Sequence, residues 1–524
     1  MLRKIRIIAA ALVFILLALL FLDFTGTLHP CIGWLAKIQL VPAVLAHSIA
    51  VIVVLVGLTF LFGRVYCSVL CPLGVAQDCI SNVSGRLGKK KSRFSFSKAK
   101  TWLRYGALGL FIVALVAHIN IIVSLLDPYS AFGRMATSLL APIYRLGNNV
   151  LAWLAEAVNS YAFYATDVWK GTWITLTIAV ATLIVIALLA WRNGRTYCNT
   201  ICPVGTFLGL ISQFSFYKAS INTEKCTNCG LCEKGCKASC IDSKTMTIDH
   251  SRCVTCFNCI DNCKFGGVKY GLALKKKVEA EQKNAPVQEF ALVDGNNSAV
   301  TRRSVMAIAW GLVMAKTLKA QENNVDGGLA ELVDKKVPDR KTPVIPAGAD
   351  SLQRMKRHCT ACQLCVSSCP NGILRPSSKL SSLMQPEMSF ERGYCRPECT
   401  ECSQVCPTGA INKITPAEKT GISRGCSYWI SDNCIVNRDE VQCRSCERHC
   451  PTGAISLHAP GHQQGQEPGQ GRGQGPGGRR ANAPLRTPVI DKEKCIGCGA
   501  CEYYCPARPF SAIYVEGHHR HHTV

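Results

Sequence analysis

Long runs of apolar residues alternate with short polar stretches over about the first 200 positions of this 524-residue chain. Four runs are long enough to form helices that cross a membrane, which takes about 20 apolar residues. We expect these helices at Ile5–Phe24, Leu40–Phe62, Trp102–Leu126 and Thr172–Trp191. The first run follows basic residues, as in a secretory signal, but it is long for a signal and lacks an A-x-A cleavage site. We therefore interpret it as an anchor.

Basic residues around these helices predict how the chain crosses the membrane. Segment 63–101 holds eight Lys and Arg residues against one acid, Asp78, whereas segment 127–171 holds three basic and three acidic residues. Because Lys and Arg are enriched in cytoplasmic loops, we expect the N-terminus and segment 63–101 to be cytoplasmic. The fourth helix then returns the chain to the cytoplasm. Residues 136–170, which are rich in aromatic side chains, are expected either as a helix along the outer interface or as a packed loop.

A short motif, Y-C-x-x-x-C-P-x-G, follows both the second and the fourth apolar run, at Tyr66–Gly74 and Tyr197–Gly205. Such a repeat predicts duplicated helix pairs that bring the two motifs together. Four converging thiols are candidates to bind a metal or cluster or to act as dithiol pairs, whereas Cys-Pro-x-Gly alone would merely shape a turn. The thiols are Cys67, Cys71, Cys198 and Cys202.

Two histidines lie within the apolar runs, His47 in the second and His118 in the third. Each is about eight residues from the expected outer end of its helix, so the two are predicted at similar depth. Ionisable residues inside a membrane usually indicate a functional site. The pair is a candidate to accept protons from quinol or to ligate haem, and the alternative is a polar contact between helices.

After the fourth run, the cysteine spacing C-x2-C-x2-C-x3-C occurs twice, in residues 226–236 and 253–263. This rhythm is typical of bacterial two-cluster ferredoxins, in which the fourth cysteine of each run ligates the other cluster. Zinc sites typically use paired C-x2-C knuckles instead. Cys240 is a spare thiol close enough to compete with Cys236. The predicted [4Fe-4S] ligand sets are Cys226, Cys229 and Cys232 with Cys263, and Cys253, Cys256 and Cys259 with Cys236.

Four further runs lie between residues 359 and 505, each ending in Cys-Pro. The third run needs an upstream ligand, and Cys434 is nearer than Cys426, which we expect to be a spare thiol. With the first unit, the chain is predicted to hold six [4Fe-4S] clusters. The expected ligands of the four runs are Cys359, Cys362, Cys365, Cys369, Cys395, Cys399, Cys402, Cys406, Cys434, Cys443, Cys446, Cys450, Cys495, Cys498, Cys501 and Cys505.

The segment between the cysteine-rich parts contains Arg302-Arg303 and a short apolar run, residues 301–315. This pattern is interpreted either as an internal twin-arginine export signal or as a buried amphipathic helix. These two interpretations place the C-terminal part on different sides of the membrane. If the segment is an export signal, the C-terminal part is periplasmic. The expected domains are 1–220 (transmembrane), 221–275 (two-cluster, cytoplasmic), 276–345 (linker), 346–517 (four-cluster, with a disordered insertion at 461–484) and 518–524 (a His-rich tail, either solvated and disordered or binding a stray metal).

Composition and charge exclude several classes of protein. The positive mean hydropathy and the near-unbroken apolar runs exclude a purely soluble enzyme, and the formal charge of +25 at first suggests nucleic acid. Six clusters of roughly −2 each would offset about half of that charge, and part of the rest lies beside apolar runs, so no nucleic-acid partner is expected. The sequence has no dinucleotide-binding or Walker loop. The predicted fold class is a membrane α-helical domain with α+β ferredoxin-like domains.

The expected spans, both C-x3-C-P motifs and the paired runs of residues 1–275 resemble the NapH-type membrane ferredoxins, quinol-oxidising components of periplasmic nitrate reductase systems. Residues 300–516 resemble the NapG-type four-cluster ferredoxins, most closely in the spacing Cys434-x8-Cys443-x2-Cys446-x3-Cys450-Pro451. The resemblance implies a natural fusion of two partners in the bacterial inner membrane.

That resemblance also implies a nested arrangement of the C-terminal ligands, in which run one exchanges its fourth cysteine with run four, and run two with run three. The implied sets are Cys359, Cys362, Cys365 with Cys505; Cys495, Cys498, Cys501 with Cys369; Cys395, Cys399, Cys402 with Cys450; and Cys434, Cys443, Cys446 with Cys406.

The sequence therefore predicts an electron-transfer protein, a quinol dehydrogenase or a subunit of one. It would oxidise menaquinol or ubiquinol from the lipid and pass single electrons through its clusters to a terminal reductase or that reductase's cytochrome partner. The alternative is a redox sensor or maturation factor for a copper or haem enzyme, in which Cys67, Cys71, Cys198 and Cys202 are the working thiols.

Overall fold

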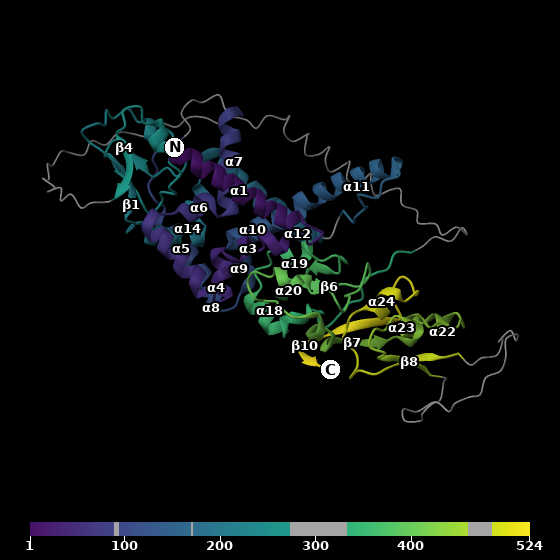
Figure 1. Cartoon of the computed structure of the whole chain (residues 1–524). Helices are drawn as coiled ribbons and strands as arrows, with labels where there is room; N and C mark the ends of the chain where they lie inside the picture. Colours follow the sequence, from purple (N-terminus) through teal and green to yellow (C-terminus); the bar gives the residue numbers. More distant parts are fainter. Residues whose placement is uncertain (88–93, 169–170, 273–332, 459–484) are drawn as a thin grey trace, which may run out of the picture. The chain divides into compact units, whose positions relative to one another are not determined.

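Helices occupy most of the described residues up to Ser212, and short paired strands follow (Figure 1). The computed structural model describes residues 1–87, 94–168, 171–272, 333–458 and 485–524. The described residues up to 272 and from 336 onward belong to one compact unit. The twin-arginine-like segment 301–315 and the insertion 461–484 lie outside the described residues.

Two helices are long and apolar enough to cross a membrane, α1 (Leu2–Leu22) and α12 (Trp173–Asn193). The expectation of continuous helices in the other two apolar runs is wrong, and a count of four spanning helices is not supported among the described residues. Each of those runs is divided into a pair of helices that pack against each other. The pairs are α4 (Leu40–Leu45) with α5 (Ile49–Phe62), and α8 (Thr101–Val116) with α9 (Asn120–Leu126).

The break in each pair is a histidine in the left-handed conformation. His47 has φ 54° and His118 has φ 56°. The amide N–H of Ser48 donates to the Ala43 carbonyl, and that of Ile119 donates to the Ala114 carbonyl, at 2.9 and 2.8 Å. These bonds span the last turn of α4 and of α8, which is the Schellman arrangement that ends a helix. Glycine usually holds this position, so the apolar pattern alone did not reveal the break.

The expected internal repeat is present in the fold. In both copies a long helix ends at a glycine with positive φ, Gly63 (73°) and Gly194 (70°), and a one-turn helix and a proline-led helix follow. In the first copy these are α6 (Val65–Val69) and α7 (Pro72–Leu87), and in the second α13 (Thr196–Thr200) and α14 (Pro203–Ser212).

Residues 136–170 form a helix over most of their length rather than a packed loop. A π-helical turn (Ala136–Leu140) leads into α11 (Ala141–Ala157), which extends away from the neighbouring helices (Figure 1). Its apolar side chains are exposed, including Ile143 and Trp153. A position along a membrane interface remains a prediction. The other short helices here are α2 (His29–Ile32), α3 (Trp34–Lys37) and α10 (Pro128–Met135).

The first cysteine-rich unit is closed by two antiparallel strand pairs. Its first and last strands pair, with Ala219 opposite Tyr270, so the two ends of the unit meet. Its strands are β1 (Tyr217–Ile221) with β4 (Val268–Leu272) and β2 (Ile241–Asp242) with β3 (Thr247–Ile248), and its helices are α15 (Leu231–Lys234) and α16 (Asn258–Asn262).

The C-terminal unit contains three further antiparallel pairs. These are β5 (Leu374–Pro376) with β6 (Pro386–Met388), β7 (Ile422–Trp429) with β10 (Ile513–Thr523), and β8 (Ile455–His458) with β9 (Thr487–Ile490). Its helices are α18 (Leu352–His358), α19 (Leu364–Ser367), α20 (Glu401–Val405), α21 (Pro416–Thr420), α22 (Ile435–Arg438), α23 (Ser445–Arg448) and α24 (Ala500–Tyr504). Three short 3-10 turns complete it (Ala347–Ala349, Leu380–Ser382 and Ser431–Asn433).

The expectation of a disordered C-terminal tail is wrong, although most of its side chains are exposed. Residues 518–523 continue β10, and His522 lies opposite Ser423 of β7. His521 forms a hydrogen bond between its Nδ1 atom and the Ala347 carbonyl at 3.0 Å. The strand pairing therefore holds the His-rich end against the C-terminal unit.

The two cysteine-rich units contact opposite ends of α1. At its N-terminal end, Arg3 forms an ion pair with Asp261 of the first unit at 3.1 Å. At its C-terminal end, α1 packs against α19, and Phe21 lies beside Gly133, whose backbone approaches the Cys362 carbonyl. Because α1 has 21 residues, these ends are about 30 Å apart.

Candidate metal centres

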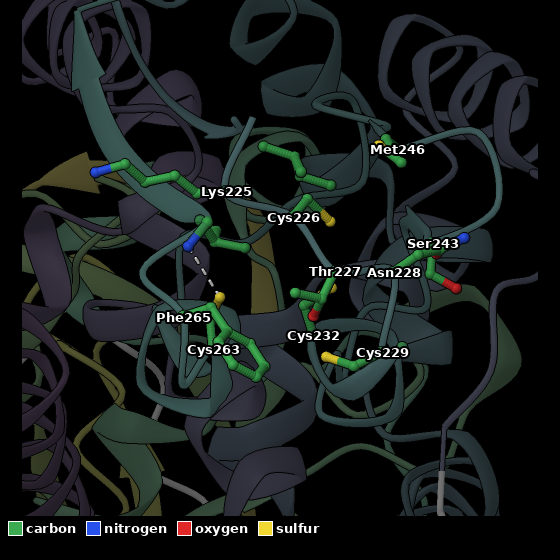
Figure 2. A pocket seen from close by; sticks show the side chains of 14 residues that line it. Lys225, Cys226, Thr227, Asn228, Cys229, Cys232, Ser243, Met246, Cys263 and Phe265 are labelled. Carbon is green, nitrogen blue, oxygen red and sulfur yellow. Dashed lines mark hydrogen bonds between the residues drawn. The ribbon is translucent and has the colours of Figure 1, made fainter. Parts of the chain in front are cut away.

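The first group of thiols is formed as the spacing predicts. Cys226, Cys229, Cys232 and Cys263 line one small cavity of about 20 Å³ (Figure 2). The amide N–H of Gly267 donates to the Cys263 sulfur at 3.1 Å, the bond drawn in Figure 2. The fourth cysteine of the second run thus reaches the three closely spaced thiols of the first run.

A second cavity, also of about 20 Å³, is lined by the other expected set and by the spare thiol Cys240. The sulfur atoms of Cys236 and Cys240 are 3.5 Å apart. The Cys240 thiol also interacts with Cys253, so it lies between two of the expected ligands. A hydrogen bond from Cys240 lowers the pKa of Cys236 to about 7. The five cysteines that line this cavity are Cys236, Cys240, Cys253, Cys256 and Cys259.

The nested grouping of the C-terminal thiols is wrong, because neighbouring runs exchange their fourth cysteines. Cys505 lines one cavity with Cys434, Cys443 and Cys446, and Cys450 packs against Cys495 and interacts with Cys498. Likewise Cys406 interacts with the first run, and Cys369 with the second. The observed sets are Cys359, Cys362, Cys365 with Cys406; Cys395, Cys399, Cys402 with Cys369; Cys434, Cys443, Cys446 with Cys505; and Cys495, Cys498, Cys501 with Cys450.

The donor sets fit [4Fe-4S] clusters. Each set holds four thiols, and backbone N–H groups point at several sulfur atoms, as at Cys359 from Ala361 (3.4 Å) and at Cys505 from Ala512 (3.3 Å). Such hydrogen bonds tune cluster potentials. Among the described residues, no three His, Cys, Asp or Glu side chains lie close enough to hold a single metal ion. A cube differs from a single ion because each of its four irons takes its own thiolate.

Burial keeps several of these thiols protonated unless iron replaces the proton. Loss of solvation raises the pKa of Cys498 to about 11 and that of Cys446 to about 12. Since the thiolate is the form that binds metal, ligation must release protons from these sites.

Arg424 lies between two of the C-terminal thiol sets and is fully buried. Its Nη1 atom donates to the Cys395 sulfur at 2.9 Å, and its Nε atom donates to the Ile496 carbonyl at 3.2 Å. Burial opposes ionisation of Cys395, but the charges and hydrogen bonds of Arg424 and Lys419 together outweigh burial and hold the pKa of this thiol below its usual value. Arg424 also interacts electrostatically with Cys498, so one cation serves both sets.

The two C-x3-C-P motifs come together through crossed arginine contacts. Nη2 of Arg64, from the first copy, donates to the Cys198 carbonyl at 3.2 Å. Nη1 of Arg195, from the second copy, donates to the Cys67 carbonyl at 2.6 Å. Sequence reasoning missed these arginines, although both stand at the same place in a longer repeat, G-R-x-Y-C-x-x-x-C-P-x-G. Because each copy of the repeat contacts the other in the same way, the four thiols of the two motifs form one group.

The glycine of each motif permits a close approach of backbone. A Cβ atom on Gly74 would lie 2.4 Å from the Cys67 carbonyl oxygen, and one on Gly205 would lie 2.3 Å from that of Cys198. Each position also lies 2.7 Å from the arginine of the other copy. No side chain fits there, so the glycine is required for the crossed contacts.

Asp78 anchors the first cysteine-rich unit to this group. Arg195 binds its carboxylate with Nε and Nη2, both at 2.9 Å, and Arg6 of α1 donates to it at 3.0 Å. Lys237, which directly follows Cys236, lies 3.6 Å from the same carboxylate. One buried acid therefore joins α1, both repeat copies and the first unit.

The two histidines of the apolar runs lie in the turns described above rather than inside continuous helices, and both are exposed. The ring centroids of His47 and His358 are 5.9 Å apart, and His358 forms a hydrogen bond between Nδ1 and the Leu45 carbonyl at 3.1 Å. His118 is near enough to interact electrostatically with His358. His358 precedes Cys359, and no pattern in the sequence predicts that it lies near His47 and His118.

A cavity of about 150 Å³ opens beside the histidines. His118, Asn120, Lys356 and Cys359 are among its lining residues. Among the described residues, the Asn120 side-chain nitrogen has no hydrogen-bond partner although it is buried. The cavity thus offers a free donor and an imidazole directly beside Cys359, which belongs to the first thiol set of the C-terminal unit.

A second buried contact joins the C-terminal unit to the helices. Asp23 and His29 form an ion pair at 3.0 Å, and Ser368 lies 2.8 Å from the other ring nitrogen of His29. Ser368 precedes Cys369. This chain fixes the orientation of the loop that carries that cysteine.

Comparison with known proteins agrees with the thiol sets. A family model described as a 4Fe-4S binding domain matches residues 45–94 and 173–219, which contain the two C-x3-C-P motifs. A model described as a 4Fe-4S dicluster domain matches 358–410 and 441–508. Each dicluster match spans two neighbouring runs, as the observed exchange of fourth cysteines requires.

Relatives were found among characterised and uncharacterised proteins. An uncharacterised protein of Methanocaldococcus jannaschii is 23% identical over 48% of this chain and 81% of its own length. The methylamine utilization ferredoxin-type protein MauN of Paracoccus denitrificans is 28% identical over 35% of this chain and 52% of its own length. The ferredoxin-type protein NapH of Haemophilus influenzae is 25% identical over 38% of this chain and 59% of its own length.

No solved structure matches the chain significantly. The relatives and the two domain matches nevertheless agree on one type of protein. The chain therefore contains 4Fe-4S domains and is similar to ferredoxin-type and electron-transport proteins, among them NapH and MauN.

Proposed function

We propose that the chain is a membrane-bound protein that oxidises quinol and passes the electrons through its iron–sulfur clusters to a terminal reductase. The observation that carries this proposal is the cavity lined by His118 and Cys359 beside His47. When bound, each [4Fe-4S] cluster accepts and returns one electron. The cavity brings a site for an organic molecule next to the entrance of a cluster chain.

The residues of the cavity suit the head group of a quinol. Oxidation of a quinol to a quinone releases two electrons and two protons from its two hydroxyl groups. The imidazoles of His118 and His47 are the proposed acceptors for those protons. The free amide nitrogen of Asn120 is a donor for the quinone oxygen. Because both histidines are exposed at helix turns, lipid-borne quinol has access to them.

The contacts at the two ends of α1 support a topology. The basic N-terminus and segment 63–101 share the end that binds the first cysteine-rich unit, so that unit is proposed to be cytoplasmic. The C-terminal unit contacts the other end, and we assign it to the periplasmic side. The terminal reductase or its cytochrome partner would then receive electrons there.

The order of the C-terminal thiol sets supports a path away from the cavity. The set of Cys359 lies at the cavity, and its partner set includes Cys395. The Cys395 amide donates to the Cys498 carbonyl at 2.9 Å, which joins the second set to the fourth. The set of Cys443 then lies at the far end and is the proposed exit.

The test uses anaerobic membranes and a menaquinol analogue, with cluster reduction followed by EPR. The double variant His47→Gly, His118→Gly removes both imidazoles but keeps residues that accept a left-handed turn. We expect it to lower the rate of quinol-driven reduction by about 10²-fold, as for loss of acid–base groups. His522→Gln, on exposed β10, is the matched control and should leave the rate unchanged.

Dithionite reduction of both variants checks that their clusters are intact. An unchanged quinol-driven rate in the double variant, with the same dithionite signal, would exclude this cavity as the quinol site. If Cys67→Ser abolished maturation of a copper or haem enzyme but left quinol-driven cluster reduction unchanged, the alternative function as a maturation factor would be favoured.

A further inference from the structure

The thiols of the two C-x3-C-P motifs form a buried group that the six ferredoxin-type sets do not include. Cys67, Cys71, Cys198 and Cys202 are each 3–4% exposed, and none forms a disulfide. Their side chains lie within electrostatic range of one another, since Cys202 interacts with the other three. The crossed arginine contacts hold the group together.

The charges around this group call for an anion. Arg64 is completely buried, and among the described residues no carboxylate forms an ion pair with it. Its hydrogen bonds go to neutral acceptors at Asn199, Ser251 and Cys198, and its Nη2 atom lies 3.8 Å from the Cys67 sulfur. A buried cation without a counter-charge is strongly unfavourable. A thiolate-ligated cluster would supply the missing negative charge.

Hydrogen-bond donors also point at the sulfur atoms of the group. The Gln77 side-chain nitrogen lies 3.3 Å from the Cys198 sulfur, and the Gly205 amide donates to the Cys202 sulfur at 3.4 Å. Cys202 caps the first turn of α14, where the helix N-terminus favours a negative group. Both sulfur atoms of the second copy therefore receive a hydrogen-bond donor.

The group lies between the two cysteine-rich units within one continuous core. That core contains Cys256 and Cys259 of the first unit, then Cys67, Cys71 and Cys202, and then Cys362 and Cys365 of the C-terminal unit. Two buried tyrosines bridge the second interval: Tyr66 interacts with Cys71, and Tyr129 interacts with Tyr66 and with Cys362. The ferredoxin units themselves are at opposite ends of α1, about 30 Å apart.

We infer that Cys67, Cys71, Cys198 and Cys202 hold a seventh iron–sulfur cluster, which carries electrons across the helical domain between the two ferredoxin units. In each step one electron leaves a reduced cluster of one unit, reduces this centre, and then reduces the nearest cluster of the other unit. No bond forms or breaks and no proton is required. The inference concerns a connection within the chain and rests on the proposed function only for the source of the electrons.

The experiment compares the purified full-length chain, prepared anaerobically, with Cys202→Ser and with Cys71→Ser. Cys79→Ser is the control, because Cys79 is an exposed thiol of α7 in the same region. Iron and sulfide are counted, and the dithionite-reduced EPR spectrum is recorded. We expect about 28 irons in the native chain, about four fewer in either motif variant, and no change in the control. The EPR intensity of the six other clusters should be retained in a motif variant that folds.

A second readout follows electron passage. With menaquinol analogue as reductant, the first unit should be reduced in the native chain and in Cys79→Ser, and should stay oxidised in Cys202→Ser. Unchanged iron content in both motif variants would overturn the inference, as would reduction of the first unit at the native rate in Cys202→Ser. Failure of the quinol proposal is distinguishable, because it would abolish quinol-driven reduction of every cluster without changing the iron count.

Discussion

At the scale of single residues, a few buried cations decide how thiol groups meet. Arg64 and Arg195 cross between the repeat copies, and Arg424 joins two thiol sets of the C-terminal unit. Their guanidinium groups supply several fixed donors each, which suits contacts to both carbonyl and sulfur atoms. Positive charge beside a cluster favours its reduced form, since reduction adds negative charge.

Arg424→Gln should therefore make the clusters at Cys395 and Cys498 harder to reduce. Loss of one charge-assisted hydrogen bond, about 1.5–3 kcal/mol, corresponds to a potential lower by about 60–130 mV for a one-electron couple. Potentiometric titration followed by EPR measures the shift. Arg424→Lys keeps the charge and should shift the potential less. Equal potentials in the native and Gln forms would show that Arg424 does not tune these sites.

At the scale of elements, the helix pairs depend on turns that the hydrophobic pattern conceals. The apolar run over 40–62 is long enough to span a membrane, so it predicts one helix. Its left-handed His47 ends α4 instead, and the same occurs at His118. The repeat of Y-C-x-x-x-C-P-x-G, in contrast, carried enough information to predict that the two motifs meet.

The turn at His118 provides a stability prediction. His118→Gly should leave the free energy of unfolding unchanged or raise it by up to about 1 kcal/mol, because glycine adopts positive φ without strain. His118→Val should lower it by about 1–2 kcal/mol, because a β-branched residue is strained there. Thermal or denaturant unfolding in detergent compares the two. Equal stability of the Gly and Val forms would contradict the left-handed turn.

The repeat glycine provides a second prediction. Gly74→Ala should lower the free energy of unfolding by at least about 2 kcal/mol, because its Cβ would overlap the Cys67 carbonyl and the Arg195 side chain. Gly106→Ala, in α8, is the matched control, since nothing lies within 4 Å of its added Cβ. The control should be neutral or more stable by up to about 1 kcal/mol. Similar losses in both variants would show that the close approach at Gly74 is not specific.

At the scale of the whole molecule, the cysteine runs could be placed from spacing, but their exchange of ligands in the C-terminal unit could not. Spacing fixes which three cysteines surround one site, whereas the fourth depends on which runs fold together. The runs of Cys359 and Cys395 fold as one pair, as the dicluster matches to 358–410 and 441–508 also indicate. The cavity at His118 and Cys359 joins parts of the chain more than 200 residues apart, so no local pattern could predict it.

The contacts at the ends of α1 predict the sidedness of the two cysteine-rich units. Protease added to the outside of spheroplasts should cleave within residues 350–515 and leave 221–272 intact. Inverted membrane vesicles should give the reverse pattern. Mass spectrometry of the released peptides measures both. Protection of both units from the outside would contradict a periplasmic C-terminal unit.

The central claim is that electrons from quinol enter at the set of Cys359 and leave through the set of Cys443. The most direct measurement is quinol-driven cluster reduction by EPR in the native chain, in Cys359→Ser and in Cys443→Ser. The account predicts that Cys359→Ser stops reduction of nearly all clusters, whereas Cys443→Ser loses only the last one. No reduction of the native clusters by the quinol analogue, or equal losses in the two variants, would contradict it.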